Sequence, residues 1–439
     1  MSALDIERDG VRRHVELDGP EGAPPVLVMH GITSCTATWD WLVPLLSSTH
    51  RVARLDFRGH GGSDRTPGEY HSAGYVSDAV AVCEIPAPTF HEKQRAAWVA
   101  ERFAALGLAD VAVDDMGNVY GRRPGAARAP SILLAAHTDT VFPAGTAIQV
   151  RRANGRLYGP GLIDNSIAVA SLLSLARALD AAQVKTKGDI WLVATVGEEG
   201  LGNLRGIRAV VERLGERVAA VVAVEGQGLG KVYNRSIGSR RYQITVRAPG
   251  GHSWGAFGNR SAIHELFKLG AAIAALDVPT TPKVTYNIGV VGGGTSVNSI
   301  AEEAYCLLDM RSGDAAALND LEARVMGLVQ QADEVDDVSV TPTLIGDRPA
   351  GAMAEDAPLI QACFEALTLI GAEAAGHAIK LTEGSTDANI PMSLGIPSTC
   401  IALTTGGGTH TLGEYMDVDP VRLGLRQLLL VTLAVVDVP

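Results

Sequence analysis

Three short apolar runs in the middle of the chain each end in side chains that bind metals. The runs are residues 131–136 before His137 and Asp139, residues 189–196 before Glu198 and Glu199, and residues 218–224 before Glu225. Apolar runs of six to eight residues between glycines and polar turns are typical of buried parallel strands, and ligands in open α/β sheets collect at the carboxyl ends of such strands. We therefore expect one histidine and several carboxylates to converge on one edge of one sheet.

A further carboxylate lies between the first two runs. Asp164 stands directly before a helix rich in Ala and Leu that we expect over 165–181. The partial positive charge at the start of a helix favours a carboxylate there. Carboxylates packed this closely raise each other's pKa unless a cation keeps them ionised. Imidazole together with carboxylates predicts Zn²⁺ or a similar first-row ion, with Co²⁺ and Mn²⁺ as alternatives.

The order and spacing of these residues resemble the M20 family of di-zinc peptidases and acylases. The pattern covers roughly residues 75–439 and consists of His137-x-Asp139, Asp164-Asn165, Glu198-Glu199, Glu225, Gly250-Gly-His252-Ser and Gly408-Thr-His410. Agreement across several segments is more specific than any single motif. The metal ligands that the resemblance implies are Asp164 as a bridge between two zinc ions, His137 and Glu225 on one ion, and Glu199 and His410 on the other.

Two carboxylates beside the ligands have other implied roles. Glu198 would be the general base that takes a proton from the attacking water and passes it to the leaving amine. Asp139 would lie behind His137 and orient its ring. The resemblance also implies a cis peptide bond between Asp164 and Asn165.

Four residues are candidate substrate contacts. The resemblance implies that His252, from this subunit or a partner, stabilises the oxyanion, and that Asn298 and Arg311 hold the substrate. Arginine suits a carboxylate, because it can bind both oxygens at once. Gly408 has two possible roles that the sequence does not separate. Its backbone N–H could donate to the substrate, or it could be a loop residue that needs positive φ.

Periodicity predicts an α/β catalytic domain with a mostly parallel sheet, formed by residues 75–237 and 347–439. Between its halves, residues 238–346 read as strand, helix, strand, strand, helix, strand, which is the ferredoxin-like α+β order. The resemblance implies that this inserted domain is a lid that carries the contact of a homodimer.

Residues 1–74 have a different pattern. Val26-Leu-Val-Met-His30-Gly31 and the segment from Asp56 to Ser63 resemble the opening of an α/β-hydrolase. The pattern gives way to an M20-like helix before any Ser nucleophile on a strand–turn–helix elbow. We expect a sheet of two or three strands in an inert appended fragment, with a second active site as the alternative.

Net charge, cysteine spacing and the lengths of the apolar segments argue against several classes of function. The net charge of −12 makes nucleic acid an unexpected partner. Five scattered cysteines without a CxxC pair argue against a disulfide framework and a thiolate zinc site. The N-terminus lacks the apolar region of a secretory signal, and the apolar run 427–436 is too short to span a bilayer. We therefore expect a cytoplasmic enzyme without a membrane partner.

The predicted function is zinc-dependent hydrolysis of an amide bond next to a free carboxylate, in a small peptide, by a carboxypeptidase- or tripeptidase-like enzyme. An N-acyl-amino-acid amidohydrolase is the alternative within the family. A rival from another class is a serine esterase using Ser253, because Gly251-His-Ser253-Trp-Gly255 matches the elbow pattern. The preceding strand alternates between apolar and polar residues, which disfavours that reading. A non-catalytic metal-binding protein is a further rival, and Glu198 argues against it.

Overall fold

The computed structural model describes residues 2–8, 11–29, 35–57, 61–63, 72–127 and 129–437. The chain divides into two compact units, Met1–Ala73 and Gly74–Pro439, each of which has its own sheet. The mixed α/β fold that the sequence predicts is confirmed.

The first unit contains a four-stranded sheet in the order β1-β2-β4-β3. Its strands are β1 (Ser2–Arg8), β2 (Val11–Asp18), β3 (Pro25–Met29) and β4 (Arg51–Leu55). The prediction of two or three strands is wrong, since β1 and β2 pair with each other and β2 also pairs with β4. Between β3 and β4 lie η1 (Thr36–Trp39) and α1 (Val43–Leu46). His30 and Gly31 lie outside the described residues.

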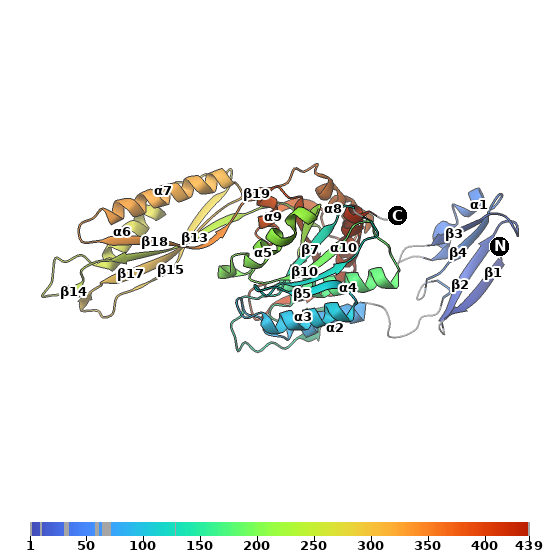
Figure 1. The fold of residues 1–439 in the computed structure, drawn as a ribbon, viewed down its shortest axis with the longest axis horizontal. Coiled ribbons are helices and arrows are strands. Elements are labelled where there is room, and N and C mark those ends of the chain that lie inside the picture. The colour runs from blue at the N-terminus through green and yellow to red at the C-terminus, as the bar shows by residue number, and fades with distance from the viewer. Residues whose placement is uncertain are drawn as a thin grey trace. The chain divides into compact units, whose positions relative to one another are not determined.

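The second unit is organised around a nine-stranded sheet (Figure 1). Its strands, in sequence order, are β5 (Ala109–Val113), β6 (Val119–Arg123), β7 (Ile132–His137), β10 (Ile190–Thr195), β11 (Ala220–Gln227), β12 (Lys231–Ser236), β19 (Gly351–Ala352), β20 (Lys380–Gly384) and β21 (Ser398–Thr404). The central strands β21, β11, β7 and β10 are parallel, whereas β6, β5 and β19 pair antiparallel at the margins. The sheet is therefore mixed, with its longest parallel stretch in the centre.

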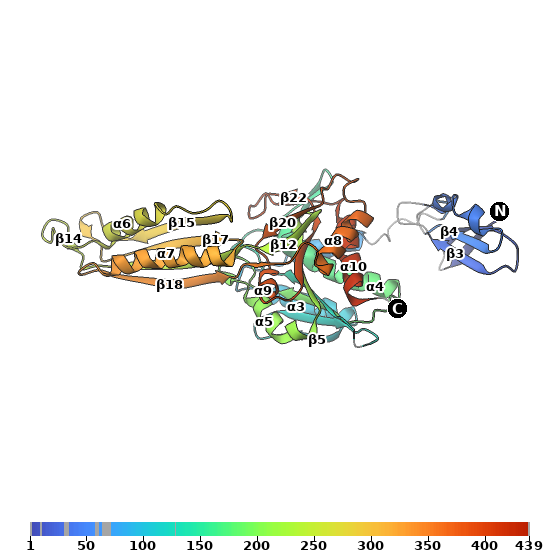
Figure 2. The same ribbon diagram turned by 90° about the horizontal axis from the view of Figure 1, so that it is seen from above.

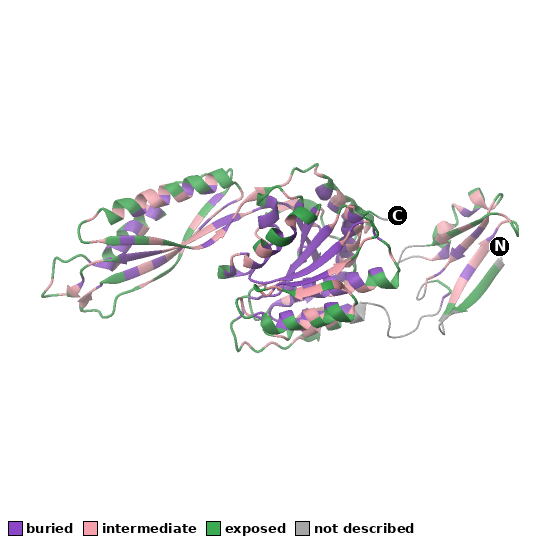
Figure 3. Cartoon of the chain, viewed as in Figure 1, coloured by how far each residue is buried: buried purple, intermediate pink, exposed green. Residues whose placement is uncertain are grey.

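Helices cover both faces of this sheet. They are α2 (Ser72–Cys83), α3 (Lys93–Ala105), α4 (Ile167–Ala181), α5 (Arg205–Leu214), α8 (Pro358–Leu369), α9 (Asn389–Ser393) and α10 (Val421–Val436). In β7, Leu134 packs into the cluster that contains α4 and α10, while Leu133 packs on the other side into the cluster that contains α5. Burial on both faces explains why the central strands are apolar throughout, as the buried colouring of Figure 3 shows.

The inserted domain is a separate layer of sheet and helix within the second unit. It consists of β13 (Gly238–Arg247), α6 (Ala262–Ala274), β15 (Val284–Gly293), β17 (Glu303–Ser312), α7 (Ala315–Asp333) and β18 (Ser339–Arg348). The four strands are antiparallel in the order β15-β17-β13-β18 and share a core with both helices. Alternate residues of β17 are buried, because one face of the sheet packs on the helices.

Two small sheets complete the second unit. One joins β14 (Gly251–His252) to β16 (Ser299–Ile300) in the inserted domain. The other contains β8 (Arg151–Ala153), β9 (Arg156–Tyr158), β22 (Gly406–Gly407) and β23 (Tyr415–Asp417). This second sheet brings the segment that precedes Asp164 against the segment that follows His410.

One stretch of helix, Leu162–Ala181, has the length and apolarity of a membrane span among the described residues. It comprises the short turn η2 (Leu162–Ser166) and α4. Most of this stretch, 78%, is buried inside the unit, so its apolar residues have the environment of a core helix.

Candidate metal centre and active site

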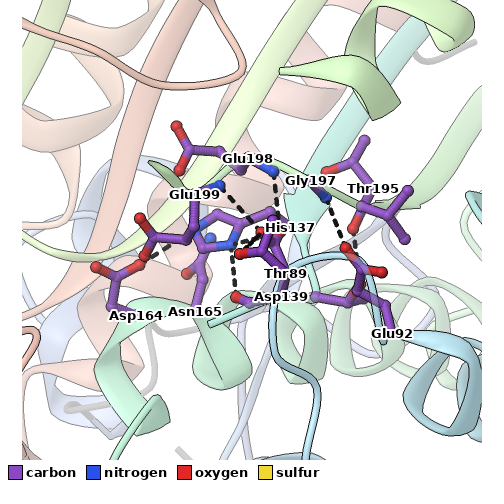
Figure 4. A network of polar contacts seen from close by, with 12 residues as sticks. Thr89, Glu92, His137, Asp139, Asp164, Asn165, Thr195, Gly197, Glu198 and Glu199 are labelled. Carbon is purple, nitrogen blue, oxygen red and sulfur yellow. Dashed lines mark hydrogen bonds and ion pairs between the residues drawn. The ribbon is translucent and has the colours of Figure 1, made fainter. Parts of the chain in front are cut away.

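Three neighbouring parallel strands bring the predicted ligands to one edge of the sheet. His137 is the last residue of β7 and pairs with Thr195, the last residue of β10. On the other side of β7, Ala135 pairs with Ala223 of β11. His137 and Glu225 each lie two residues further along, so they reach the same level of the sheet. Glu198 and Glu199 follow β10 at this edge (Figure 4).

The side chains of five predicted ligands form a continuous series of contacts. His137 Nε2 lies 3.1 Å from Asp164 Oδ1 and 3.7 Å from Glu225 Oε2. His410 Nε2 lies 3.2 Å from Asp164 Oδ2 and 3.2 Å from Glu199 Oε1. Each oxygen of Asp164 therefore faces a different histidine, and each histidine also faces a second carboxylate.

This donor set fits a pair of divalent cations. Ligand atoms of His137, Asp164 and Glu199 lie within 4.8 Å of one another. One imidazole and one terminal carboxylate would serve each ion, and Asp164 has an oxygen on each side to join them. His137 and Glu199 are buried, whereas the side chain of His410 is 53% exposed, which leaves the site open on that side.

The contacts shift the pKa values of these groups in a consistent pattern. Burial lowers the pKa of His137, but the neighbouring carboxylates, above all Glu225, raise it well above the ordinary value. Contacts with Asp164 and Glu199 raise the pKa of His410 to about 10. Burial raises the pKa of Glu225 to about 7. The cluster thus attracts positive charge, as a metal site must.

Asp139 contacts both the ring of His137 and the turn that carries Glu198 and Glu199. Its carboxylate lies 3.6 Å from Nδ1 of His137, whereas its backbone carbonyl oxygen lies 3.1 Å from the same nitrogen. The carboxylate accepts hydrogen bonds from the backbone N–H groups of Glu198 and Glu199 and from the hydroxyl of Thr89. Asp139 therefore holds the Glu198–Glu199 turn, and both its backbone carbonyl and its carboxylate face Nδ1 of His137 (Figure 4). The Asp164–Asn165 peptide bond is cis.

Three buried charged residues support the site, and sequence analysis assigned no role to two of them, Arg95 and Glu92. Arg95 donates to the carbonyl oxygen of Thr138, beside His137. Glu92 accepts from the N–H of Gly197 and pairs with Arg205. Asp387 accepts a hydrogen bond from the hydroxyl of Thr195 at the end of β10. Each contact spans more than forty residues, so no local pattern could reveal it.

Glu198 has a partner that the sequence did not indicate. Arg348, the last residue of β18, donates from Nη1 to Glu198 Oε1 at 3.0 Å and to Ser385 Oγ at 3.1 Å. A second guanidinium nitrogen of Arg348 donates to the backbone carbonyl of Glu198. Burial raises the pKa of Glu198 well above the ordinary value, although Arg348 opposes this. The end of the inserted domain is therefore tied to the predicted general base.

The other candidate substrate residues lie apart from the ligands. His252 is in β14, at the end of the inserted domain remote from the nine-stranded sheet (Figures 1 and 2). Asn298 accepts from the hydroxyl of Ser296, and Arg311 in β17 forms an ion pair with Asp309. Gly408 has φ 70° and lies in the loop before His410. Among these residues, the described contacts bring only the Gly408 loop to the metal centre.

Comparisons with known proteins agree with this geometry. The sequence model of peptidase family M20/M25/M40 matches residues 133–433, and that of the alpha/beta hydrolase fold matches residues 24–86. The second match extends over α2, although Tyr75, Ala79 and Val82 of this helix pack into the core of the second unit.

Several curated proteins are similar to this chain over much of its length. A putative succinyl-diaminopimelate desuccinylase of Mycobacterium tuberculosis is 30% identical over 315 residues, which are 69% of this chain and 80% of the relative. The succinyl-diaminopimelate desuccinylase of Corynebacterium glutamicum is 28% identical over 244 residues, 54% of this chain. This match spans 66% of the length of the C. glutamicum enzyme.

Solved structures show the same fold. A tripeptidase from Staphylococcus aureus superposes with a TM-score of 0.71 at 21% identity, covering 84% of this chain and 100% of the other. A dinuclear metal binding peptidase of the M20 family from Bacillus subtilis gives a TM-score of 0.60 at 15% identity, covering 84% and 99%. On the family match and the assembled ligand cluster, the chain belongs to peptidase family M20/M25/M40 and is a hydrolase that acts on amide bonds.

Proposed function

We propose that this chain hydrolyses an amide bond next to a free carboxylate, using two zinc ions held by His137, Asp164, Glu199, Glu225 and His410. The observation that carries the proposal is the placement of Asp164, whose two oxygens face two different histidines. A carboxylate in this position joins two cations better than it serves one, because each oxygen already has its own partner. Bound there, the ions would supply Lewis acidity to the scissile carbonyl and to a water molecule.

Glu198 is the general base in this proposal. Its carboxylate is buried beside the ligand Glu199, and burial raises its pKa, which suits a group that must accept and return a proton near neutral pH. Arg348 holds the Glu198 side chain through Oε1. The carboxylate takes a proton from the attacking water and delivers it to the leaving amine.

His252 stabilises the oxyanion in this proposal. Its Nδ1 accepts hydrogen bonds from the backbone N–H groups of Trp254 and Gly255. The neutral ring therefore carries its proton on Nε2, where it can donate to a developing negative charge. Because β14 lies at the remote end of the inserted domain, we propose that residues 238–346 act as a lid and that a second subunit supplies this histidine.

The substrate is a small peptide or an N-acyl amino acid with a free carboxylate. Arg311 and Asn298 on the lid, together with the Gly408 backbone, would hold its end groups. The tripeptidase structure favours the peptide, whereas the desuccinylase relatives favour the N-acyl compound. A cytoplasmic location stays a prediction.

The structure disfavours the esterase alternative. Ser253 follows the two-residue strand β14, and the next helix, α6, begins only at Ala262. The elbow needs a strand that leads directly through the serine into a helix. A serine nucleophile also needs a histidine and an acid beside it, but His410 contacts Glu199 and Asp387 contacts Thr195.

The test compares Glu198→Gln with the wild-type chain after metal removal and reconstitution with Zn²⁺. Dipeptides, tripeptides and N-acyl amino acids serve as substrates. We expect chelation to abolish wild-type turnover, and Glu198→Gln to keep both ions while kcat falls by about 10² to 10⁴. Near-normal turnover of the loaded variant would remove Glu198 from the mechanism. Inhibition by a serine reagent but not by a chelator would instead support the esterase.

A further inference from the structure

Glu414 is a fully buried carboxylate at the junction of the two segments that carry Asp164 and His410. It directly precedes β23 and lies four residues after His410. β23 pairs with β9, the strand that leads into the Asp164 loop. The contacts of Glu414 therefore connect parts of the chain that are about 250 residues apart in sequence.

The carboxylate of Glu414 binds the backbone of the Asp164 loop at three points. Oε1 accepts from the N–H of Ile163 at 2.8 Å and from the N–H of Asp164 at 3.1 Å. Oε2 accepts from the N–H of Gly161 at 3.1 Å. The main chain adds a further link, because the N–H of Gly159 donates to the carbonyl oxygen of Glu414.

These contacts require a carboxylate and not merely a polar group. Both oxygens of Glu414 act as acceptors, which an amide side chain cannot reproduce, because its nitrogen would meet the N–H of Gly161 as a second donor. Among the described residues, no cationic side chain forms an ion pair with Glu414. Both oxygens therefore serve the Asp164 loop and no other charged group among the described residues.

We infer that Glu414 is a positioning residue that sets the bridging carboxylate of Asp164 opposite His410. This inference rests on the proposed function, since it gives Glu414 a role only if Asp164 and His410 hold metal. The side chain of His410 is 53% exposed, so its own surroundings constrain it weakly. Glu414 fixes both loops to each other, and it thereby fixes the separation between the two ligands.

The test is Glu414→Gln, studied with Co²⁺ alone as the probe in the full chain. Asp417→Asn is the matched control, because Asp417 lies three residues further on and contacts Arg156 and Thr405 but not the Asp164 loop. Co²⁺ affinity is measured by competition with a chelator, and ligand geometry by the visible absorption of the bound ion. The thermal midpoint of each metal-free protein reports the fold separately.

We expect Glu414→Gln to weaken Co²⁺ binding by about tenfold or more and to change the spectrum of the bound ion, as loss of a group that orients metal ligands does. Asp417→Asn should bind Co²⁺ like the wild type. Equal affinity and equal spectra for Glu414→Gln and wild type would overturn the inference while leaving the proposed function intact. A wild-type chain that binds no Co²⁺ would overturn the proposed function as well.

A second variant covers the case in which Glu414→Gln does not fold. Glu414→Asp keeps the negative charge but withdraws the carboxylate by one methylene, which lengthens its contacts with Gly161, Ile163 and Asp164. We expect a smaller loss of Co²⁺ affinity than for Glu414→Gln, with a metal-free thermal midpoint near that of the wild type. Unchanged affinity in this variant would also count against a positioning role.

Discussion

The two units of this chain both bury charged side chains, but they balance the charge in different ways. In the first unit, Arg54 is almost fully buried and contacts Asp18, Asp40 and Glu16 at 2.7, 2.7 and 2.8 Å. A permanent cation there meets the carboxylates directly. In the second unit, Asp164 and its neighbouring carboxylates face histidines, which are neutral near pH 7 at their ordinary pKa.

This difference separates a structural charge network from a candidate site. The acids of the first unit that pair with Arg54 already have a cation within the protein. Acids that are paired only with histidine raise the histidine pKa and compete for any available cation. The comparison therefore predicts that metal binding and amide hydrolysis belong to the second unit alone.

Removal of the shared carboxylate should have the largest effect. Asp164→Ala takes away the group that faces both His137 and His410. We expect the variant to lose bound metal and kcat/KM to fall by about 10³-fold or more. This fall is at least as large as the one caused by removing a single hydrogen-bond donor to the transition state. Metal analysis and kinetics check this. Asp180→Asn on α4, where Asp180 is exposed and paired with Arg123, is the control and should behave as wild type.

Disruption of the charge network in the first unit should lower the stability of that unit without changing metal binding. Arg54→Met removes the cation that contacts Asp18, Asp40 and Glu16, so we expect the unit to lose about 3 to 5 kcal/mol of stability. Hydrogen exchange of residues 11–29 and 35–57 measures this loss. Arg247→Met breaks an exposed pair with Glu303 and should cost only about 0 to 1 kcal/mol. If Arg54→Met also lowered metal content, the two units would not be independent in the way the comparison requires.

Deletion of the first unit should have the smallest effect on catalysis. A chain that begins at Ser72 keeps α2, whose residues Tyr75 and Val82 are buried in the core of the second unit. We expect unchanged kcat/KM and unchanged metal content, because no ligand of the cluster lies before residue 72. Loss of turnover in a folded, metal-loaded deletion variant would show that the fragment contributes to the reaction.

The sequence by itself, read together with the family resemblance, predicted the candidate ligands that the fold brings together. His137, Glu199 and Glu225 stand at the ends of apolar runs, and a run of this kind specifies both a buried strand and the place where it ends. Parallel pairing of neighbouring strands then brings those ends together. Asp164 could be added because it directly precedes the predicted helix, in the cis peptide segment that the family resemblance implied.

Only the tertiary structure decided how the ligands are held. Arg348 reaches Glu198 across 150 residues, and Glu414 reaches the Asp164 loop across about 250. Asp139 likewise holds the backbone of Glu198 and Glu199 in addition to facing the ring of His137. Such contacts depend on the packing of segments that share no local periodicity, so nothing in the neighbouring sequence specifies them. Strand ends are local properties of the chain, whereas the partners of a buried charge are set by the folded core around it.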